Sequence, residues 1–334
     1  MVVKFKKILV TGGAGYVGSA LVPALLKAGH AVRVLDLYLY GDPLRDVQKD
    51  PNLEQVKGDL RDQAILDKAA QGCDAVIHLA CVSNDPSFEL DPALGKSINY
   101  DAFFGLMKAV RRAGVQRLIY ASSSSVYGLR EESDVREETP CTPLTDYSNY
   151  KLMCEEALRA DGLGGAEYVI VRPATVCGYA PRMRLDLSVN ILTIHALIKK
   201  QITVFGGSQL RPNINVLDMV DVYKLLLEAP KDKIHGDVFN AGYENMSLSR
   251  IAAMVKSQIK DPTITIKVEP TNDLRSYHVN SDKIARVLGF RAHHTLEEAI
   301  ESIHTSFLAG HLKEPLTNPL YYNIKTMQLA NLGG

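Results

Sequence analysis

The stretch ILVTGGAGYVGSALVPALLKAGHAVRVLD, residues 8–36, constrains the fold of this chain more than any other. Gly12, Gly15 and Gly18 stand at GxxGxxG spacing between a run typical of a buried strand and a helical pattern. Glycine at such a turn lets the backbone bend tightly, lets a pyrophosphate approach and lets the helix pack closely on the sheet. A tight turn without a ligand is the alternative explanation. The free N–H groups at the helix start favour an anion site.

The end of the next strand pattern carries a carboxylate. Asp36 follows the glycines by roughly 20 residues, where an acidic side chain accepts the ribose hydroxyls of NAD and repels a 2′-phosphate. The sequence therefore predicts NAD as the cofactor. Arg33 and Arg45 leave NADP as the alternative, although neither directly follows the acidic position.

Two further stretches fit a dinucleotide. In KGDLRD, Asp59 follows a strand pattern and could accept a bond from the adenine amino group, or it could cap a helix. In HLAC, Leu79, Ala80 and Cys81 end a strand where small residues would let the nicotinamide ribose approach the backbone. Simple packing of Cys81 in the core explains that residue almost as well.

Apolar, β-rich runs alternate with helical patterns through the first half of the chain. This alternation predicts an α/β fold with a doubly wound parallel sheet, a Rossmann domain, followed by a smaller mixed C-terminal lobe that binds substrate. The expected Rossmann domain is 1–173 with a return segment near 213–240. The expected substrate lobe is 174–212 and 241–315, and a tail, 316–334, either wraps a surface or lacks order. Helices are expected at 16–29, 93–113, from 145 onward, and at 189–200, 218–228, 247–259 and 295–308.

Charge and cysteine content exclude several classes of protein. The chain has 38 basic and 38 acidic residues and no basic block, which argues against nucleic-acid binding. No segment reaches the roughly 18 apolar residues of a membrane span. The five cysteines show no CxxC spacing, so we expect neither disulfides nor zinc, and a reducing, cytoplasmic location. His293 and His294 are adjacent and make a poor metal pair, so no metal is expected.

Tyr147 and Lys151 in YSNYK stand four residues apart on a predicted helix and so share one face. A free tyrosine, with a pKa near 10, is a poor base at neutral pH. An ammonium about 5 Å away, at an effective dielectric constant of about 20, favours the phenolate by roughly 3 kcal/mol, which lowers the pKa by about 2 to 2.5. The pair therefore predicts a general base. Tyr150 cannot share that geometry and is assigned to packing.

The run YASSSSVYG, residues 120–128, follows the strand pattern QRLIYA. In a doubly wound sheet such a strand ends at the crevice where ligands bind. A hydroxyl at this place can bridge a substrate oxygen and Tyr147. We therefore interpret the serines as a strand end that delivers one catalytic hydroxyl.

From Lys7 to about Gly289 the sequence resembles the extended short-chain dehydrogenases/reductases, in particular the sugar-nucleotide epimerase and dehydratase group. The resemblance rests on TGGAGYVG, HLAC, SSSSVYG, YSNYK, VRPATVCG and GGSQLRPNINVLD. It implies Ser123 as the catalytic hydroxyl, with Lys151 also on the nicotinamide ribose. It implies a homodimer in which the helices at 93–113 and 145–160 pair across a two-fold axis. It adds these cofactor contacts: Tyr16, Val17, Leu60 and Asn99.

The resemblance also makes Ser124 and Ser125 informative. Sugar 4,6-dehydratases in this group carry an acid–base pair such as Asp-Glu at these two places, and the related decarboxylases use a Glu there. A GDP-mannose 3,5-epimerase would have Cys at the second place. Serines supply neither a carboxylate nor a thiol, whereas simple hydride transfer needs only Ser123, Tyr147, Lys151 and the nicotinamide.

On the substrate side, RPATVCGYAPRMRLDLSVN departs from the group's usual RxxNVYGP, with Thr175 where Asn is common and Cys177 where an aromatic is common. The resemblance places diphosphate and sugar contacts at four arginines, although each could equally be a surface residue: Arg182, Arg184, Arg211 and Arg275. Guanidinium suits phosphate because it binds in a bidentate fork. Further expected contacts to the sugar or base are Ser83, Thr175, Asn190 and Gln209.

The function expected from the resemblance is that of an NAD-dependent epimerase of a nucleotide-diphosphate sugar, at C4, through a transient 4-keto intermediate. The alternative is net oxidation or reduction at C4 of such a sugar. A 4,6-dehydratase and a non-catalytic NAD-sensing module are less favoured. Neither the base nor the sugar can be determined from these residues.

Overall fold

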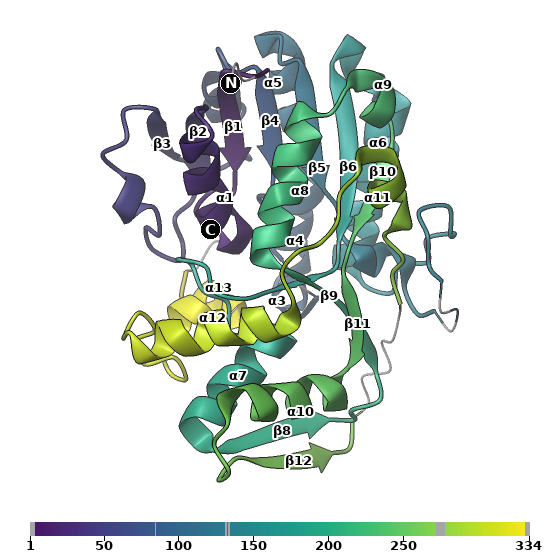
Figure 1. Ribbon diagram of the computed structural model, residues 1–334. Helices are drawn as coiled ribbons and strands as arrows, with labels where there is room; N and C mark the ends of the chain where they lie inside the picture. Colours follow the sequence, from purple (N-terminus) through teal and green to yellow (C-terminus); the bar gives the residue numbers. More distant parts are fainter. Residues whose placement is uncertain (1–3, 84, 131, 133, 272–277, 331–334) are drawn as a thin grey trace.

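A computed structural model describes residues 4–83, 85–130, 132, 134–271 and 278–330 (Figure 1). Its main element is a sheet of seven parallel strands in the order β3, β2, β1, β4, β5, β6, β10. The strands are β3 (Leu53–Lys57), β2 (Ala31–Asp36), β1 (Lys7–Thr11), β4 (Ala75–His78), β5 (Arg117–Ala121), β6 (Glu167–Pro173) and β10 (Val238–Ala241). The order reverses between β1 and β4, which in doubly wound sheets marks the ligand crevice. The predicted fold class is confirmed.

Helices cover both faces of this sheet. One face carries α1 (Tyr16–Lys27), α8 (Val216–Glu228), α9 (Lys231–Ile234) and α11 (Asp282–Leu288). The other carries α2 (Gln63–Ala70), α5 (Ala102–Ala113) and α6 (Asp146–Asp161). Burial on both faces explains the continuous apolar runs of the central strands β1 and β4.

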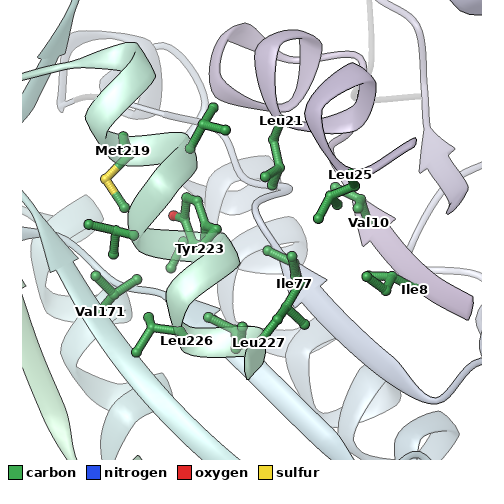
Figure 2. Close-up of a cluster of buried hydrophobic side chains, with 14 of the residues drawn as sticks. Ile8, Val10, Leu21, Leu25, Ile77, Val171, Met219, Tyr223, Leu226 and Leu227 are labelled. Carbon is green, nitrogen blue, oxygen red and sulfur yellow. The ribbon is translucent and has the colours of Figure 1, made fainter. Parts of the chain in front are cut away.

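The core beneath α1 and α8 shows how distant segments are joined (Figure 2). Leu21 and Leu25 on α1 face Tyr223 and Leu227 on α8 across the apolar side chains of β1, β4 and β6. All four side chains are buried, and full burial of a large apolar side chain contributes about 1.5–3 kcal/mol. This packing holds the start of α1, and with it the glycine turn, in a fixed position.

The helix expected at 93–113 is interrupted. The chain instead forms α4 (Pro92–Lys96), a π-helical turn η2 (Ser97–Asp101) and then α5. The wide turn contains Asn99, whose side chain accepts a hydrogen bond from Val82 N at 2.8 Å and donates one to Val82 O at 2.9 Å. Single π-turns inside helices often occur at functional sites. Here the turn fixes the loop that follows β4.

A smaller lobe lies at the C-terminal edge of the large sheet (Figure 1). It contains two small sheets, β11–β9–β7 and β12–β8, packed with helices around a separate apolar cluster. Its elements are β7 (Thr175–Cys177), α7 (Ser188–Lys199), β8 (Gln201–Phe205), β9 (Leu210–Asn215), β11 (Glu244–Ser247), α10 (Leu248–Ile259), β12 (Thr265–Glu269) and α12 (Leu296–Leu308).

The remaining elements are short. They are η1 (Arg45–Val47), α3 (Asp85–Glu89), η3 (Ser124–Tyr127), η4 (Gly162–Gly165), η5 (Pro319–Tyr321) and α13 (Asn323–Ala330). Among the described residues, no helix has both the length and the apolar character needed to cross a bilayer.

Candidate active site

One cavity of about 430 Å³ opens at the C-terminal edge of the large sheet. The glycine turn, the end of β2, the serine run and the start of α6 all line it, together with the loop from 173 to 187. Parallel strands place their carboxyl ends at the same edge, which explains why motifs so far apart in the sequence meet here.

The glycine turn forms a close cradle. Gly12 has φ +76°, and a Cβ on it would lie 2.6 Å from Ala80 N. A Cβ on Gly18 would lie 2.5 Å from Gly12 O, so the start of α1 could not approach the turn with any other residue. The backbone therefore leaves the space and the N–H groups that a pyrophosphate needs, which fits a dinucleotide.

Asp36 closes the adjacent end of the cavity. Its carboxylate accepts hydrogen bonds from Ala14 N at 3.0 Å and Tyr38 N at 2.8 Å. Burial raises the pKa of Asp36 above its ordinary value, and these two backbone donors oppose the rise. The carboxylate is thus held in place where the ribose of a dinucleotide bound on the glycine turn would lie.

Of the other predicted cofactor residues, all but Asn99 line the same cavity. They are Tyr16, Val17, Asp59, Leu60, Leu79, Ala80 and Cys81. Asp59 does not cap a helix, since Asp62 caps α2 and Asp59 instead pairs with Arg61 at 2.6 Å. Asn99, although it lies within the described residues, does not line the cavity, because its amide is used by the backbone of Val82.

Tyr147 and Lys151 lie on the first turns of α6, which begins where the sequence predicted. Thr145 caps the helix in a capping box with Ser148. Lys151 is buried, and its Nζ donates a hydrogen bond to Ala121 O at 2.7 Å and lies 5.9 Å from the centroid of the Tyr147 ring. The ammonium is therefore fixed beside the end of β5, on the same helix face as the phenol.

The four serines have different roles. Ser123 caps the 3-10 turn η3, and its Oγ accepts hydrogen bonds from Ser125 N at 3.1 Å and from Ser125 Oγ at 2.9 Å. Ser124 is buried, and Ser122 donates to the Glu155 carboxylate beneath the site. Ser123 and Tyr147 both line the cavity. The link from Ser125 to Ser123 was not predicted from the sequence.

A buried polar network supports the serine run from below. Arg172 on β6 forms a bidentate pair with Glu155 on α6, at 2.7 and 2.9 Å, and donates to Tyr127 Oη at 2.9 Å. Tyr127 in turn donates to Asn240 Oδ1 on β10 at 2.7 Å. The network ties the loop after β5 to two neighbouring strands and a helix. No local pattern in the sequence indicates it, because its members are far apart along the chain.

Of the predicted substrate residues, Ser83, Thr175, Arg182, Arg184 and Arg211 line the cavity. Arg275 lies outside the described residues. Asn190 and Gln209 are described, yet neither lines the cavity. Asn190 binds Gly178 N, Arg184 O and Tyr16 Oη, while Gln209 binds Gly207 N and Phe205 O. Both amides therefore shape loops around the site, since their polar atoms are already used there.

Several residues of the cavity wall were not predicted from the sequence, among them Tyr40, Asn323 and Met327. Tyr40 follows β2, and Asn323 and Met327 lie on α13 near the C-terminus. An isolated tyrosine in a loop and a helix in the tail carry no motif, so only the tertiary arrangement reveals them.

The sequence pattern of the NAD dependent epimerase/dehydratase family matches residues 8–242. This match spans more than half of the chain, and the protein belongs to that family. NAD is accordingly its cofactor, as Asp36 and the glycine turn indicate. The predicted family, enzyme class and cofactor are confirmed.

Comparisons with individual proteins lead to the same family. A UDP-glucose 4-epimerase of Lactobacillus helveticus is 29% identical over 333 residues, covering 92% of this chain and 98% of the relative. The solved structure of an epimerase from Methanothermobacter thermautotrophicus superposes with a TM-score of 0.83 at 25% identity, covering 91% and 93% of the two chains. MoeE5, solved in complex with UDP-glucose and NAD, superposes with a TM-score of 0.77 at 28% identity, covering 91% and 99%.

Proposed function

We propose that this protein is an epimerase of a nucleotide-diphosphate sugar and inverts C4 through a transient 4-keto sugar. The observation that carries the proposal is the cavity wall formed by Ser123, Tyr147 and Lys151, next to Ser124 and Ser125 in place of acid–base carboxylates. The similarity to a UDP-glucose 4-epimerase and to MoeE5, solved with UDP-glucose, supports a sugar nucleotide as substrate.

In this mechanism Tyr147, as the phenolate, removes the proton of the C4 hydroxyl. Ser123 donates a hydrogen bond to the same oxygen, and the Lys151 ammonium stabilises the phenolate. Bound NAD supplies a reversible acceptor for the C4 hydride. Once the 4-keto sugar has rotated in the cavity, the hydride would return to the opposite face of C4, and Tyr147 returns its proton to the same C4 oxygen. Arg184 and Arg211 line the cavity and offer guanidinium groups for the diphosphate.

Net oxidation or reduction at C4 uses the same three side chains and is the second candidate. It differs in that the cofactor must exchange after every turnover. Dehydration is less favoured, because it requires a proton donor and acceptor at C5 and C6, which two serines do not supply.

The test is a panel of UDP-, GDP-, CDP- and dTDP-sugars with the products followed by NMR. We expect one sugar nucleotide to reach an equilibrium mixture of its two C4 epimers without added cofactor. A product oxidised or reduced in proportion to added cofactor would support the second candidate instead.

Replacing Ser123 by Ala should lower kcat/KM by an amount equal to about 2–4 kcal/mol of transition-state stabilisation, the value of one lost catalytic hydrogen bond. Ser124→Ala, at a buried neighbour, is the matched control and should cost far less. Ser125→Ala should fall between them, because its hydroxyl donates to Ser123. Steady-state kinetics on the three variants measures this order. Equal losses in Ser123→Ala and Ser124→Ala would contradict the assignment.

We also propose that the protein is a homodimer, paired through α5 and α6. Phe104 on α5 keeps 39% of its surface exposed and packs edge-on against Tyr100 on the adjoining π-turn, which supports an apolar contact on this side. Light scattering at micromolar concentration should give twice the mass of one chain for the wild-type protein. The Phe104→Glu variant should give the mass of a single chain. A monomeric wild-type protein would oppose the proposal.

We further propose a cytoplasmic location. All five cysteines are free thiols, as expected for a reducing compartment. Cell fractionation with a cytoplasmic marker enzyme tests this, and recovery with an exported fraction would contradict it.

A further inference from the structure

The C-terminal helix α13 takes part in the wall of the cavity. It lies against α3 near the lower end of the large sheet, where Figure 1 draws it in yellow. Asn323 and Met327 line the cavity from this helix. Met327 also packs against the buried cluster that includes Val82 and Phe88. The last helix is thus a component of the site and does not merely lie on the outer surface.

Asn323 makes the main polar contacts between α13 and the cavity wall. It is 1% exposed, and all its polar groups are used. Its side-chain amide donates to Ser83 Oγ at 2.8 Å, its side-chain carbonyl accepts from Arg182, and its backbone N–H donates to Asp186 at 3.1 Å. Ser83 follows β4, whereas Arg182 and Asp186 belong to the loop after β7. One amide therefore connects two segments of the cavity wall, the loop after β4 and the loop after β7.

The tail that carries Asn323 is itself anchored. Leu185 N donates to Tyr321 O at 2.9 Å, which adds a backbone bond to the same loop. Thr326 Oγ1 donates to Pro319 O at 2.7 Å, and Tyr322 Oη donates to Pro315 O at 2.8 Å. These bonds make the segment from 315 to 326 a compact unit, which can hold Asn323 at a fixed place.

The wall that Asn323 holds lies over the part of the cavity that fits the dinucleotide. The guanidinium carbon of Arg182 lies 3.7 Å from the centroid of the Tyr40 ring, and Arg182 N donates to Ser19 Oγ on α1 at 3.0 Å. Tyr40, Asp36 and the glycine turn line the same cavity. The Arg182 guanidinium therefore contacts both Asn323 on the tail and Tyr40 at the cofactor end of the site.

We propose that Asn323 is a latch that retains NAD by joining Ser83, in the loop after β4, to Arg182, in the loop after β7. While this latch is closed, the loop after β7 stays seated over Tyr40 and the glycine turn, and the cofactor leaves slowly. Slow exchange suits an enzyme that regenerates its cofactor in each turnover. The inference rests on the NAD site and also deepens the proposed epimerase function, because a reductase would need rapid exchange.

The experiment compares the rate at which NAD leaves the purified, NAD-loaded protein. Asn323→Ala removes the bond to Ser83 and the bond to the charged Arg182, and we expect NAD to dissociate about 10- to 100-fold faster. Gln328→Ala is the matched control, an amide removed from an exposed position of the same helix, and should leave the rate unchanged. Retained NAD is measured after gel filtration at successive times.

A second pair covers the case in which Asn323→Ala does not fold. Met327→Ala should also speed NAD release, whereas Leu329→Ala, at a side chain 72% exposed, should not. Melting temperatures check that the variants remain folded. Release rates of Asn323→Ala and Met327→Ala equal to those of their controls would overturn the latch. The assay needs no sugar, so its failure is distinguishable from a failure of the proposed epimerase activity.

Discussion

Tyr147→Phe is expected to lower kcat by about 10²–10⁴-fold, the usual contribution of a positioned general acid–base group. Only a hydroxyl is lost, so binding of NAD and of the nucleotide should remain nearly intact. Single-turnover reduction of the bound NAD by the substrate, followed across a range of pH, measures the effect. The structure supports this expectation by placing Tyr147 in the cavity wall, one helical turn before the buried ammonium of Lys151.

Tyr150→Phe is the matched control, because it makes the same chemical change three residues further along α6. The Tyr150 ring packs against Phe88 and Tyr100, and its loss of a hydroxyl should leave the rate close to that of the wild type. Lys151→Met should impair both turnover and NAD binding, since the ammonium serves the phenolate and, by resemblance, the nicotinamide ribose. If Tyr147→Phe retained more than about a tenth of the wild-type rate, Tyr147 would not be the base.

Glu155→Ala is expected to lower the free energy of unfolding by about 3–5 kcal/mol, the cost of breaking a buried ion pair by removing one partner. Glu155 is fully buried, and its removal leaves the Arg172 guanidinium without its bidentate partner and Ser122 without its acceptor. Burial alone would lower the pKa of Arg172, but the adjacent Glu155 raises it above the ordinary value. A guanidinium has an ordinary pKa above about 12, so it stays charged at neutral pH without Glu155, and the variant buries an unpaired charge.

Glu156→Ala provides the control, because the next residue of α6 is exposed and should change stability by less than about 0.5 kcal/mol. Urea unfolding followed by circular dichroism measures both variants at equal protein concentration. A loss in Glu155→Ala no larger than that in Glu156→Ala would show that the network contributes little to stability.

The fold and the cofactor end of the site could be predicted because their signals are local. The glycine spacing, Asp36 at a strand end and the continuous apolar strands each follow from short-range geometry. The motif pair of Tyr147 and Lys151 lies within one helix, so its shared face also follows from spacing alone. These features required no knowledge of how distant segments meet.

The remaining parts of the site depend on long-range contacts. Asn190 and Gln209 have the chemistry of a sugar ligand, yet the fold uses their amides to hold loops. Asn323 has no motif around it and enters the cavity only because the tail packs back on the loop after β7. A polar residue's partners are set by the tertiary structure, so its role could not be determined from the sequence.

The central claim is that hydride leaves C4 of a sugar and returns to the same carbon. The most direct measurement uses the sugar nucleotide found in the panel, labelled with deuterium at C4, and follows the products by NMR in ordinary water. The mechanism predicts that both epimers keep the label at C4, with no hydrogen exchanged at C3 or C5 when the unlabelled substrate reacts in deuterium oxide. Loss of the C4 label, or entry of solvent deuterium at C5, would contradict it.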